Sequence, residues 1–456
     1  MTTTSSRLKG PAVRLIEANT IAELTATEFL HLLERREVAL GDYARACMDR
    51  IDQFDPMLRA FRSFDRARVE ARIAQLEARF QQGPMARMSG VPVAVKDIFN
   101  TYDYPTGMGS PILEGYTPGN DARVVSNVRL EDGIIVGKTV TAEFAVHNPS
   151  ATVNPHDHRR TPGTSSSGSA VAVATRMAPV ALASQTAGSV IRPASYCGVF
   201  GYKPSFGLLP RTAVLKTADT LDTVGFMARS VDDLALMFEV CRVRGHNYPV
   251  TEAALGHPAR QRVLGRAWRV GLVQGPKSGF ESAAARSGLK RLCARLAAAG
   301  CDIFEYRLPD AFEETHDTHE RIYRRSLAYY FKTEWSSNSA LFSPILQEMI
   351  RRGFEISPEQ YQADLQRQVK LAQLFDEECE KFDVLIGLST ADDAPIGLDA
   401  GDLPDHCLIW TMVGAPSISL PLLSGSSGLP VGVQIVARKY ADYKLLDFVR
   451  IVVQEV

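Results

Sequence analysis

Residues 161–170 read TPGTSSSGSA and residues 184–194 read SQTAGSVIRPA, so hydroxyl-bearing and very small side chains are concentrated in two neighbouring stretches. Segments rich in Ser and Gly are typical of flexible linkers, because they solvate well and order poorly. They are also suited to a catalytic site in which backbone, hydroxyl groups and substrate must approach one another closely. The sequence around the two stretches distinguishes these interpretations.

The overall composition is that of a globular protein. Of the 456 residues, 45% are hydrophobic and 23% are charged, and Lys plus Arg (51) nearly balance Asp plus Glu (52). A formal net charge of −1 predicts no broad basic surface for a nucleic acid, and we interpret the basic cluster at 156–160 as a solvated loop. We therefore expect small molecules as partners.

Cysteine usage and hydropathy bear on location. The seven cysteines are scattered, with no Cys-x-x-Cys pair, which is typical of reduced thiols in the cytosol. The first residues, MTTTSSRLKGPAVRLIEANT, contain no apolar run of signal-peptide length, and no segment has the roughly 18 to 20 apolar residues of a membrane helix. We expect a cytoplasmic protein that does not bind membranes.

Patterns along the chain predict an α/β protein. Residues 20–80 are expected to be helical, with capping boxes at Thr20 with Glu23 and at Thr25 with Glu28. Apolar runs of strand length then follow at 91–95, 133–137, 178–183, 268–273 and 384–388, with helical patterns between them. We expect a loop at 244–266 and a charged, aromatic helical lid at 310–380.

Three familiar motifs fail on inspection. GIIVGKT at 133–139 lacks the first Gly of a phosphate-binding loop, because position 132 is Asp. The nucleophile elbow Gly-x-Ser-x-Gly fails around Ser165, because position 167 is Ser. The segment HDTHE at 316–320 would place two imidazoles on one helix face, but this pattern more often marks a polar surface than a metal site. We expect no metal and no cofactor.

One lysine and one loop have the properties of catalytic groups. Lys96 directly follows the apolar run VPVAV, and burial there would lower its pKa and allow it to act as a base. The alternative is that Lys96 pairs with Asp97 or extends into water. In QTAGS, the successive amides of Thr186, Ala187, Gly188 and Ser189 could converge on an anion, although such a loop could equally be a simple tight turn.

Taken together, several motifs resemble those of the amidase signature family. They are GVPVAVKD, TPGTSSSGSAVAVA, ALASQTAGSVIRPASYCGVFGYKPSFG, TLDTVGFMARSVDDLALM, MVGAPSISLP and GLPVGVQIVAR, in that order along the chain. The resemblance covers nearly the whole chain and is weakest at 244–266 and 310–380. It implies a single domain over 1–456 with an N-terminal helical region at 20–80, a catalytic core at 90–240 and a lid at 310–380. The implied fold is a central, mostly parallel mixed β-sheet covered by helices on both faces.

The resemblance also implies a Ser-Ser-Lys triad. Ser189 matches the nucleophile, Ser165 the bridging serine and Lys96 the base, and the Thr164–Ser165 peptide bond is expected to be cis. The resemblance places an oxyanion hole at the amides of Thr186, Ala187 and Gly188. Met108 and Gly109 match the segment near the acyl pocket and are candidate substrate contacts.

The sequence departs from the family pattern at several positions. Thr164 and Ser167 replace glycines in the first motif, Gln185 and Ala187 replace Asp and Gly in the second, and the usual Arg is displaced from 191 to 192. These changes put the bracing of the oxyanion loop in doubt.

The resemblance leaves two enzymatic functions open. The expected function is hydrolysis of a small amide, aryl amide, carbamate (urethane) or urea. The aromatic run YRRSLAYYF suggests a pocket for an apolar group, although Tyr329, Tyr330 and Phe331 could equally be core residues. The alternative is the glutaminase subunit of a transfer-RNA amidotransferase. For the first function we expect a small-molecule amide or carbamate partner, no nucleic acid and no membrane, and the sequence leaves a homodimer open.

Overall fold

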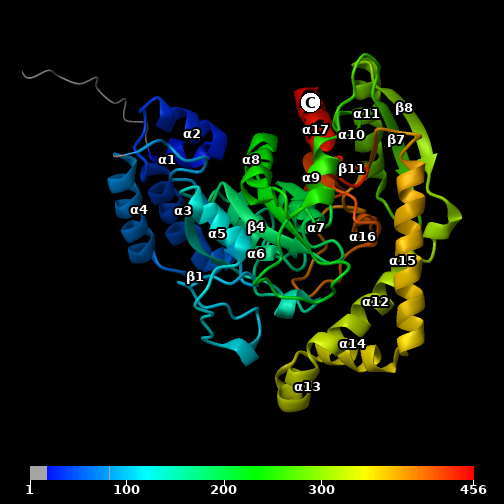
Figure 1. The fold of residues 1–456 in the computed structure, drawn as a ribbon, viewed down its shortest axis with the longest axis horizontal. Coiled ribbons are helices and arrows are strands. Elements are labelled where there is room, and N and C mark those ends of the chain that lie inside the picture. Colours follow the sequence, from blue (N-terminus) through cyan, green and yellow to red (C-terminus); the bar gives the residue numbers. More distant parts are fainter. Residues whose placement is uncertain (1–17, 82, 456) are drawn as a thin grey trace, which may run out of the picture.

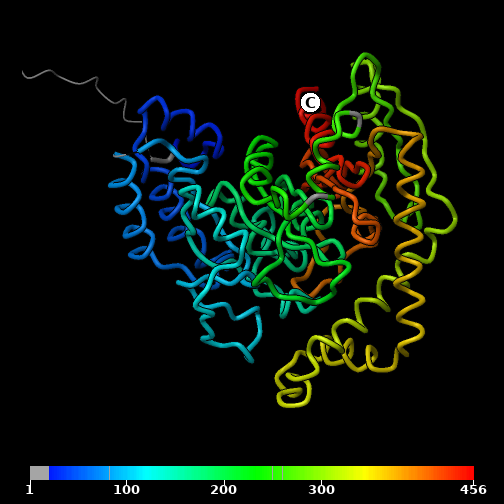
Figure 2. The backbone as a smooth tube through the Cα atoms, in the orientation of Figure 1, coloured from blue at the N-terminus to red at the C-terminus, as the bar shows by residue number. Residues whose placement is uncertain are grey.

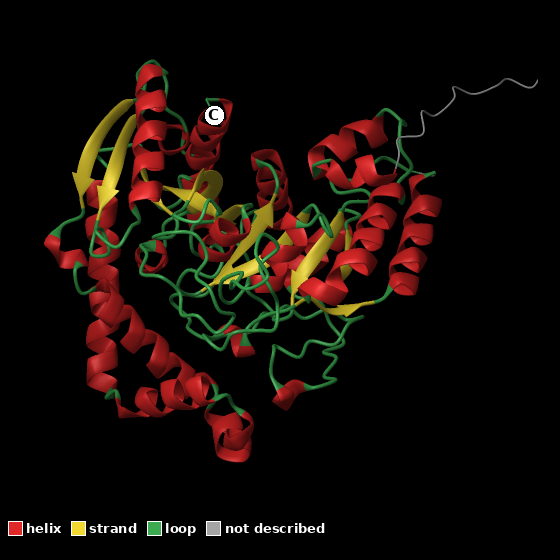
Figure 3. Cartoon of the chain, turned by 180° about the vertical axis from the view of Figure 1, so that it is seen from behind, coloured by secondary structure: helices red, strands yellow, loops and turns green. Residues whose placement is uncertain are grey.

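A single large β-sheet runs through the part of the chain that the computed structural model describes, residues 18–81 and 83–455 (Figures 1 and 3). It is an 11-stranded sheet with the strand order β1-β3-β2-β4-β6-β5-β10-β11-β9-β7-β8. The strands are β1 (Phe61–Phe64), β2 (Pro92–Lys96), β3 (Ile134–Thr139), β4 (Val180–Gln185), β5 (Phe200–Lys203), β6 (Thr223–Ala228), β7 (Arg269–Gln274), β8 (Asp302–Arg307), β9 (Val384–Leu388), β10 (Ser417–Ser424) and β11 (Pro430–Ala437).

The five apolar runs expected to be strands are confirmed as β2, β3, β4, β7 and β9. Every residue of β2, β3 and β9 is buried, which explains why these strands show continuous apolar runs instead of alternation. The mixed α/β class is therefore confirmed.

Strand direction differs in part from the expectation of a mostly parallel sheet. Parallel pairs are confined to β3–β2–β4 and to β9–β7–β8, and the remaining pairs of the described sheet are antiparallel. The parallel groups are the ones with helical crossovers, such as α5 (Arg123–Leu130) between β2 and β3. Strands β10 and β11 are joined by a short turn, which reverses the chain.

Helices cover both faces of the sheet. The helix α6 (Ser167–Ala174) contacts β2, β3, β4 and β6, and α7 (Ile191–Cys197) contacts β5, β10 and β11. The helix α8 (Val231–Cys241) contacts α5 and α17 (Asp442–Gln454) as well as β4, β5 and β6. Because right-handed crossovers place α5 and α6 on opposite faces, the two groups of helices enclose the sheet.

Close packing explains the small residues of α6. A Cβ atom added at Gly168 would lie 2.2 Å from the carbonyl oxygen of Ala60 and 2.5 Å from the amide nitrogen of Val140. Any larger residue would push α6 away from the sheet. The stretch is therefore a tightly packed helix start, and the linker interpretation is wrong.

The N-terminal part consists of α1 (Ala18–Glu23), α2 (Ala26–Glu34), α3 (Asp42–Leu58) and α4 (Arg66–Phe80), at the blue end of Figure 1. The capping box of Thr25 and Glu28 is confirmed at the start of α2. The one expected at Thr20 is wrong, because Thr20 lies inside α1. The edge strand β1 was not expected, since its FRSF sequence is short and carries an arginine. The prediction that no signal peptide is present concerns residues 1–20, most of which lie outside the described residues.

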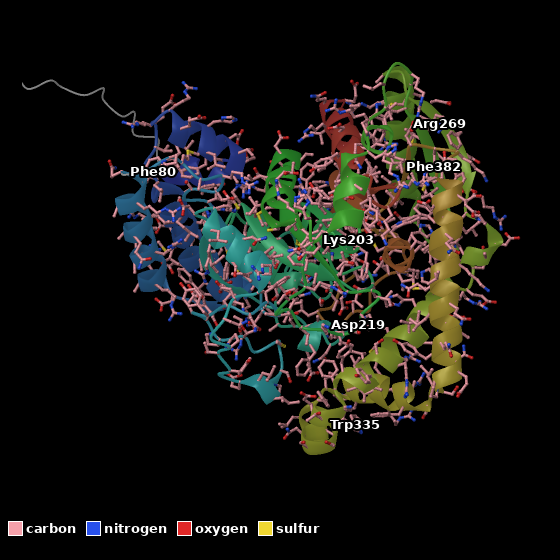
Figure 4. The ribbon with its side chains drawn as sticks, viewed as in Figure 1. Phe80, Lys203, Asp219, Arg269, Trp335 and Phe382 are labelled. Atoms are coloured by element: carbon pink, nitrogen blue, oxygen red, sulfur yellow. The ribbon has the colours of Figure 1, made fainter. Side chains whose placement is uncertain are left out.

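Residues 310–378 form an elongated helical arm, coloured yellow in Figures 1 and 2. Its elements are η3 (Asp310–Phe312), α12 (Thr315–Tyr330), α13 (Lys332–Asn338), η4 (Ser339–Leu341), α14 (Pro344–Glu355) and α15 (Pro358–Glu378). Trp335 on α13 lies near the far end of the arm (Figure 4). The arm encloses an aromatic cluster of its own, in which Phe144 from the main body lies 4.7 Å from the ring centre of Phe331.

The remaining helices are α9 (Pro249–Gly256), α10 (Pro258–Gln261), α11 (Ala283–Ala298) and α16 (Cys407–Met412), together with η1 (Pro111–Leu113) and η2 (Glu143–Ala145). The loop expected at 244–266 thus contains two short helices. No helix within 18–81 and 83–455 has both the length and the apolar character needed to cross a bilayer.

Candidate active site

Lys96 is the last residue of β2 and is completely buried. The strand lies between β3 and β4, so the ammonium group is surrounded by protein on both sides. Desolvation lowers the pKa of Lys96 to about 7, and the negative charge of Asp222 opposes this only in part. A large fraction of Lys96 is therefore uncharged at neutral pH.

Three hydroxyl groups surround the Lys96 amine. Its Nζ lies 2.8 Å from Ser165 Oγ, 3.0 Å from Ser166 Oγ and 3.0 Å from Ser184 Oγ. Ser166 donates its own proton to the carbonyl oxygen of Ser184 at 3.2 Å, so it can only accept from Lys96. The first stretch and the start of the second stretch, which lies at the end of β4 (Val180–Gln185), thus meet at the lysine.

The alternative partner for Lys96 is used elsewhere. Asp97 forms an ion pair with Lys138, whose Nζ lies 2.9 Å from Asp97 Oδ1. Asp97 also accepts a hydrogen bond from the amide of Gly107 at 3.1 Å. The structure therefore excludes the interpretation in which Lys96 pairs with Asp97 or extends into water.

Ser165 lies in the turn that leads into α6, and it is almost completely buried. The Thr164–Ser165 peptide bond is cis, as expected. Ser166 is the N-cap residue of α6, yet its side chain makes no capping hydrogen bond. Its hydroxyl group faces Lys96 and Ser184 instead.

Ser189 lies between β4 and α7 and is half-buried. Within the described residues, no hydrogen bond joins the Ser189 hydroxyl to Ser165, whose hydroxyl is bonded to Lys96. The fold thus brings Lys96 and Ser165 together, while a proton transfer from Ser189 to Ser165 belongs to the proposal below.

The loop before Ser189 is braced by side chains. Gln185 accepts hydrogen bonds from the amides of Val190 and Ile191 at 2.9 and 3.1 Å, and it donates to Thr411 Oγ1 at 3.0 Å. Thr411 in turn donates to the carbonyl oxygen of Ala187 at 2.9 Å. Gln185, a departure from the family pattern, therefore both caps α7 and supports the loop.

Thr186 is held by its own hydroxyl group, which donates to Asp222 Oδ1 at 2.7 Å. Asp222 also accepts from the hydroxyl of Thr217 at 2.7 Å. In contrast, no protein acceptor among the described residues takes the backbone amides of Ala187, Gly188 or Ser189. These N–H groups are therefore available to a ligand.

A side chain cannot be accommodated at Gly188. An added Cβ atom would lie 2.7 Å from Arg192 Nη2 and 3.0 Å from Cys407 Cβ. Arg192 itself is held by Asp405 Oδ2 at 2.7 Å from its Nε and by Asp402 Oδ2 at 2.6 Å from its Nη1. The displaced arginine thus packs against the loop that precedes Ser189.

Met108 and Gly109 lie in a turn, and Met108 packs against the aromatic cluster of the arm. Both residues have a left-handed backbone, with φ of 53° and 69°. An added Cβ at Gly109 would lie 2.9 Å from the carbonyl oxygen of Thr141, so this position requires glycine. The carbonyl of Met108 accepts from the amide of Phe144 at 2.7 Å.

A cavity of about 410 Å³ opens beside Ala187 and Arg192. Its lining includes Lys277 and Arg324 as cations and Glu320 and Asp402 as carboxylates. Burial raises the pKa of Asp402, and nearby Arg192 opposes this shift in part. The cavity therefore carries charged groups of both signs in its lining and has the size of a small-molecule site.

The aromatic run at 323–331 does not have the expected role of forming an apolar pocket. The side chain of Tyr329 is exposed, and the hydroxyl of Tyr330 donates to Asp219, which is labelled in Figure 4. Phe331 is buried against Phe144 and Phe342. Among the aromatic side chains of this run, Tyr323 alone lines the cavity beside Ala187 in the described chain.

Four residues that contact Lys96 or the loop before Ser189 were not identified as site residues from the sequence: Ser184, Asp222, His319 and Thr411. Ser184 had a weak signal, because it belongs to the second stretch. The others lie far from Ser189 along the chain, in the segment before β6, in the arm and in α16. The HDTHE segment forms no metal cluster within the described part of the chain.

If Lys96 acts as the base, activity should depend on its deprotonation. Because only the neutral amine can accept a proton, we expect kcat/KM to rise with pH through the pKa of about 7 and then to level off. The measurement is kcat/KM between roughly pH 5.5 and 9. A profile that is flat or falls through neutral pH would contradict the assignment.

Comparison with known proteins identifies the family. A family model described as Amidase matches residues 42–446. A glutamyl-tRNA(Gln) amidotransferase subunit of Nocardia farcinica (strain IFM 10152) is 31% identical over 480 residues, covering 92% of this chain and 96% of that protein. The native peptide amidase of Stenotrophomonas maltophilia has a similar crystal structure, with a TM-score of 0.80 at 23% identity over 96% of this chain and 97% of that chain.

The fold and the buried residues define a mixed α/β protein with a lysine–serine cluster at the end of a central strand. The chain belongs to the amidase signature family, whose enzymes act on carbon–nitrogen bonds.

The comparisons correct the expectation about partners. Small molecules alone, without nucleic acid, are not what the curated relatives indicate, because those proteins are named as subunits of an amidotransferase for glutamyl-tRNA(Gln). The composition misled because a net charge near zero reports on the absence of a broad basic surface and not on whether a protein works as part of a larger assembly.

Proposed function

We propose that this protein hydrolyses a carbon–nitrogen bond of a small amide through an acyl-enzyme on Ser189, with Lys96 as base and Ser165 as proton relay. The observation that carries the proposal is the fully buried Lys96, whose Nζ lies 2.8 Å from Ser165 Oγ. Nucleophile activation by an adjacent base is what a serine hydroxyl requires, since it is unreactive at its ordinary pKa.

The neighbours of Lys96 favour a lone pair directed at Ser165. A neutral amine has two N–H groups and one lone pair. Ser166 and Ser184, each 3.0 Å away, can accept the two N–H groups. The lone pair then remains for the proton of Ser165, which in turn can accept the proton of Ser189.

The proposed cycle balances at each step. Ser189 Oγ forms a bond to the substrate carbonyl carbon while its proton passes through Ser165 to Lys96. Collapse of the intermediate breaks the C–N bond, and the relay returns the proton to the departing nitrogen. A water molecule then attacks the acyl-enzyme and gives its proton to the same relay. As the bond between the acyl carbon and Ser189 Oγ breaks, the relay returns this proton to Ser189 Oγ and the acid is released.

The oxyanion of the intermediate would be bound by backbone amides of the loop. We assign this role to Thr186, Ala187 and Gly188, with the adjoining amide of Ser189. The amides of Ala187, Gly188 and Ser189 have no protein acceptor among the described residues. Each such donor contributes about 2.7 to 4 kcal/mol to lowering the barrier in a comparable site.

For the substrate, we propose glutamine, with ammonia handed to a partner in an amidotransferase assembly. The support is the 31% identity to a glutamyl-tRNA(Gln) amidotransferase subunit over most of both chains. The cavity beside Ala187 also suits an amino acid amide, because carboxylates and cations both line it. They could bind the α-ammonium and α-carboxylate groups of glutamine, respectively.

A second candidate is an aryl amide, carbamate or urea. The departures at Gln185, Ala187 and Ile191 favour it, because they distinguish this chain from the usual family pattern. Met349 and Leu408 also give the cavity an apolar part. Met108 and Gly109 stay proposed substrate contacts in either case.

A substrate assay separates the two candidates. We expect the purified protein to convert glutamine to glutamate and ammonia, with a rate that increases when the companion amidotransferase proteins of the same organism are added. Ammonia release should be measured beside a panel of anilides, carbamates and ureas, with Ser189→Ala as the blank. Turnover of the panel with no turnover of glutamine, with or without the companion proteins, would favour the second candidate instead.

A further inference from the structure

Two carbonyl groups of the loop before Ser189 accept hydrogen bonds from distant side chains. His319 Nε2 lies 2.8 Å from the carbonyl oxygen of Thr186, and Thr411 Oγ1 donates to the carbonyl oxygen of Ala187 at 2.9 Å. Because a carbonyl oxygen only accepts, His319 must carry its proton on Nε2. The two donors come from the arm helix α12 and from α16, respectively.

Holding a carbonyl group also sets the direction of the next amide. The peptide unit is planar, and in its trans form the C=O of one residue and the N–H of the following residue point in opposite directions. The bond from His319 therefore orients the amide of Ala187, and the bond from Thr411 orients the amide of Gly188. These are two of the amides that no protein acceptor in the described chain takes.

The state of His319 suits a permanent donor. Its side chain is 3% exposed, and burial lowers its pKa to about 4, while its hydrogen bond to the Thr186 carbonyl opposes this shift only in part. The imidazole is therefore neutral across the neutral pH range. A neutral ring keeps one N–H and avoids a buried positive charge.

We propose that His319 and Thr411 are positioning residues that hold the Thr186–Ala187 and Ala187–Gly188 peptide planes so that their amides are preorganised for an oxyanion. The inference rests on the proposed function of Ser189. It also gives a role to the second histidine of HDTHE and ties the helical arm to the nucleophile loop.

The neighbours of Thr411 support this assignment. Gln185 Nε2 donates to Thr411 Oγ1 at 3.0 Å, so the hydroxyl proton of Thr411 is directed toward Ala187. Gln185 also accepts from the amides of Val190 and Ile191, which follow Ser189 directly. The loop is thus held on both sides of the nucleophile.

The test uses the rate at which a fluorophosphonate probe labels Ser189, which requires no knowledge of the substrate. Labelling forms the Ser189 Oγ–P bond, breaks the P–F bond and releases fluoride, while the hydroxyl proton passes to Lys96. The probe's phosphoryl oxygen gains negative charge in this step and needs the same amides as an amide carbonyl.

His319→Leu and Thr411→Val remove the hydrogen-bond donor at each position. His319→Gln and Thr411→Ser keep a donor at each position. Since loss of a whole oxyanion donor costs roughly 10²- to 10³-fold, we expect the first pair to slow labelling by about 10- to 100-fold. The second pair should stay within about fivefold of wild type because a donor remains. On the substrate found in the assay above, kcat should fall with KM little changed.

Thermal unfolding midpoints of all four variants serve as the control for folding. Equal labelling rates for the Leu and Gln variants at 319, and for the Val and Ser variants at 411, would overturn the inference. If His319→Leu fails to fold, the labelling rate of the nearly isosteric Thr411→Val, compared with that of Thr411→Ser, still tests the inference. Failure of the wild type to be labelled, or equal labelling of Ser189→Ala, would instead overturn the proposed function of Ser189.

Discussion

Replacing Ser189 by alanine is expected to reduce kcat by roughly 10⁴-fold or more, because no other group in the proposed cycle can form the acyl-enzyme. The substituted residue is half-buried and makes no hydrogen bond to Ser165 in the described structure, so the fold should be unaffected. Steady-state turnover and mass spectrometry of the trapped acyl-enzyme measure the effect. The adduct should be absent from the variant.

Ser167→Ala is the matched control for this experiment. Ser167 belongs to the same serine-rich stretch as Ser165, but its hydroxyl pairs with that of Ser150 at 3.0 Å and is not assigned to the relay. We expect kcat of Ser167→Ala to stay within about fivefold of the wild-type value, because the lost hydrogen bond takes no part in the reaction. Retained turnover in Ser189→Ala with wild-type kinetics would exclude Ser189 as the nucleophile.

Replacing Lys96 by methionine should lower kcat by roughly 10²- to 10⁴-fold, the range that general base catalysis contributes. Methionine nearly fills the volume of the lysine stem and carries no charge to desolvate. The thermal midpoint should therefore stay near that of wild type. The rise of kcat/KM through pH 7 should also disappear, because Lys96 is the group expected to titrate there.

Lys203→Met is a stringent control for Lys96→Met. Lys203, labelled in Figure 4, is also completely buried, and desolvation lowers its pKa to about 7 as well. Its Nζ contacts the carbonyl oxygens of Pro204 and Ala415 instead of catalytic hydroxyls. The rising pH limb should persist in the folded Lys203→Met protein. If the rising pH limb is instead lost in Lys203→Met and kept in Lys96→Met, Lys203 and not Lys96 is the base.

The core strands were predictable because burial on both faces demands an unbroken apolar run. The runs at 91–95 and 384–388 show this directly, and each became a fully buried strand. Strand direction was only partly predictable. Crossover helices reveal parallel neighbours such as β2 and β3, whereas the pairing of β5 with β10 joins segments more than 200 residues apart and leaves no local signal.

The candidate site was predictable only where its residues lie inside recognisable motifs. Lys96, Ser165 and Ser189 belong to such motifs, and the cis peptide bond before Ser165 was expected on the same basis. Thr411 could not be found in this way, and His319 was noted only as part of HDTHE, which favoured a polar surface although the residue is buried. Each acts on the loop through one hydrogen bond across the fold, and a single donor residue leaves no pattern in the sequence.

From its sequence alone, the protein is a mixed α/β member of the amidase signature family, since apolar runs and contiguous motifs are local properties of a chain. Tertiary structure alone decided that Asp97 pairs with Lys138, that three hydroxyls surround Lys96, and that Gln185 and Thr411 brace the loop before Ser189. Those features depend on which side chains meet in space. Desolvation and hydrogen bonding, which set the pKa of Lys96 and the direction of the loop amides, arise only when distant segments are packed together.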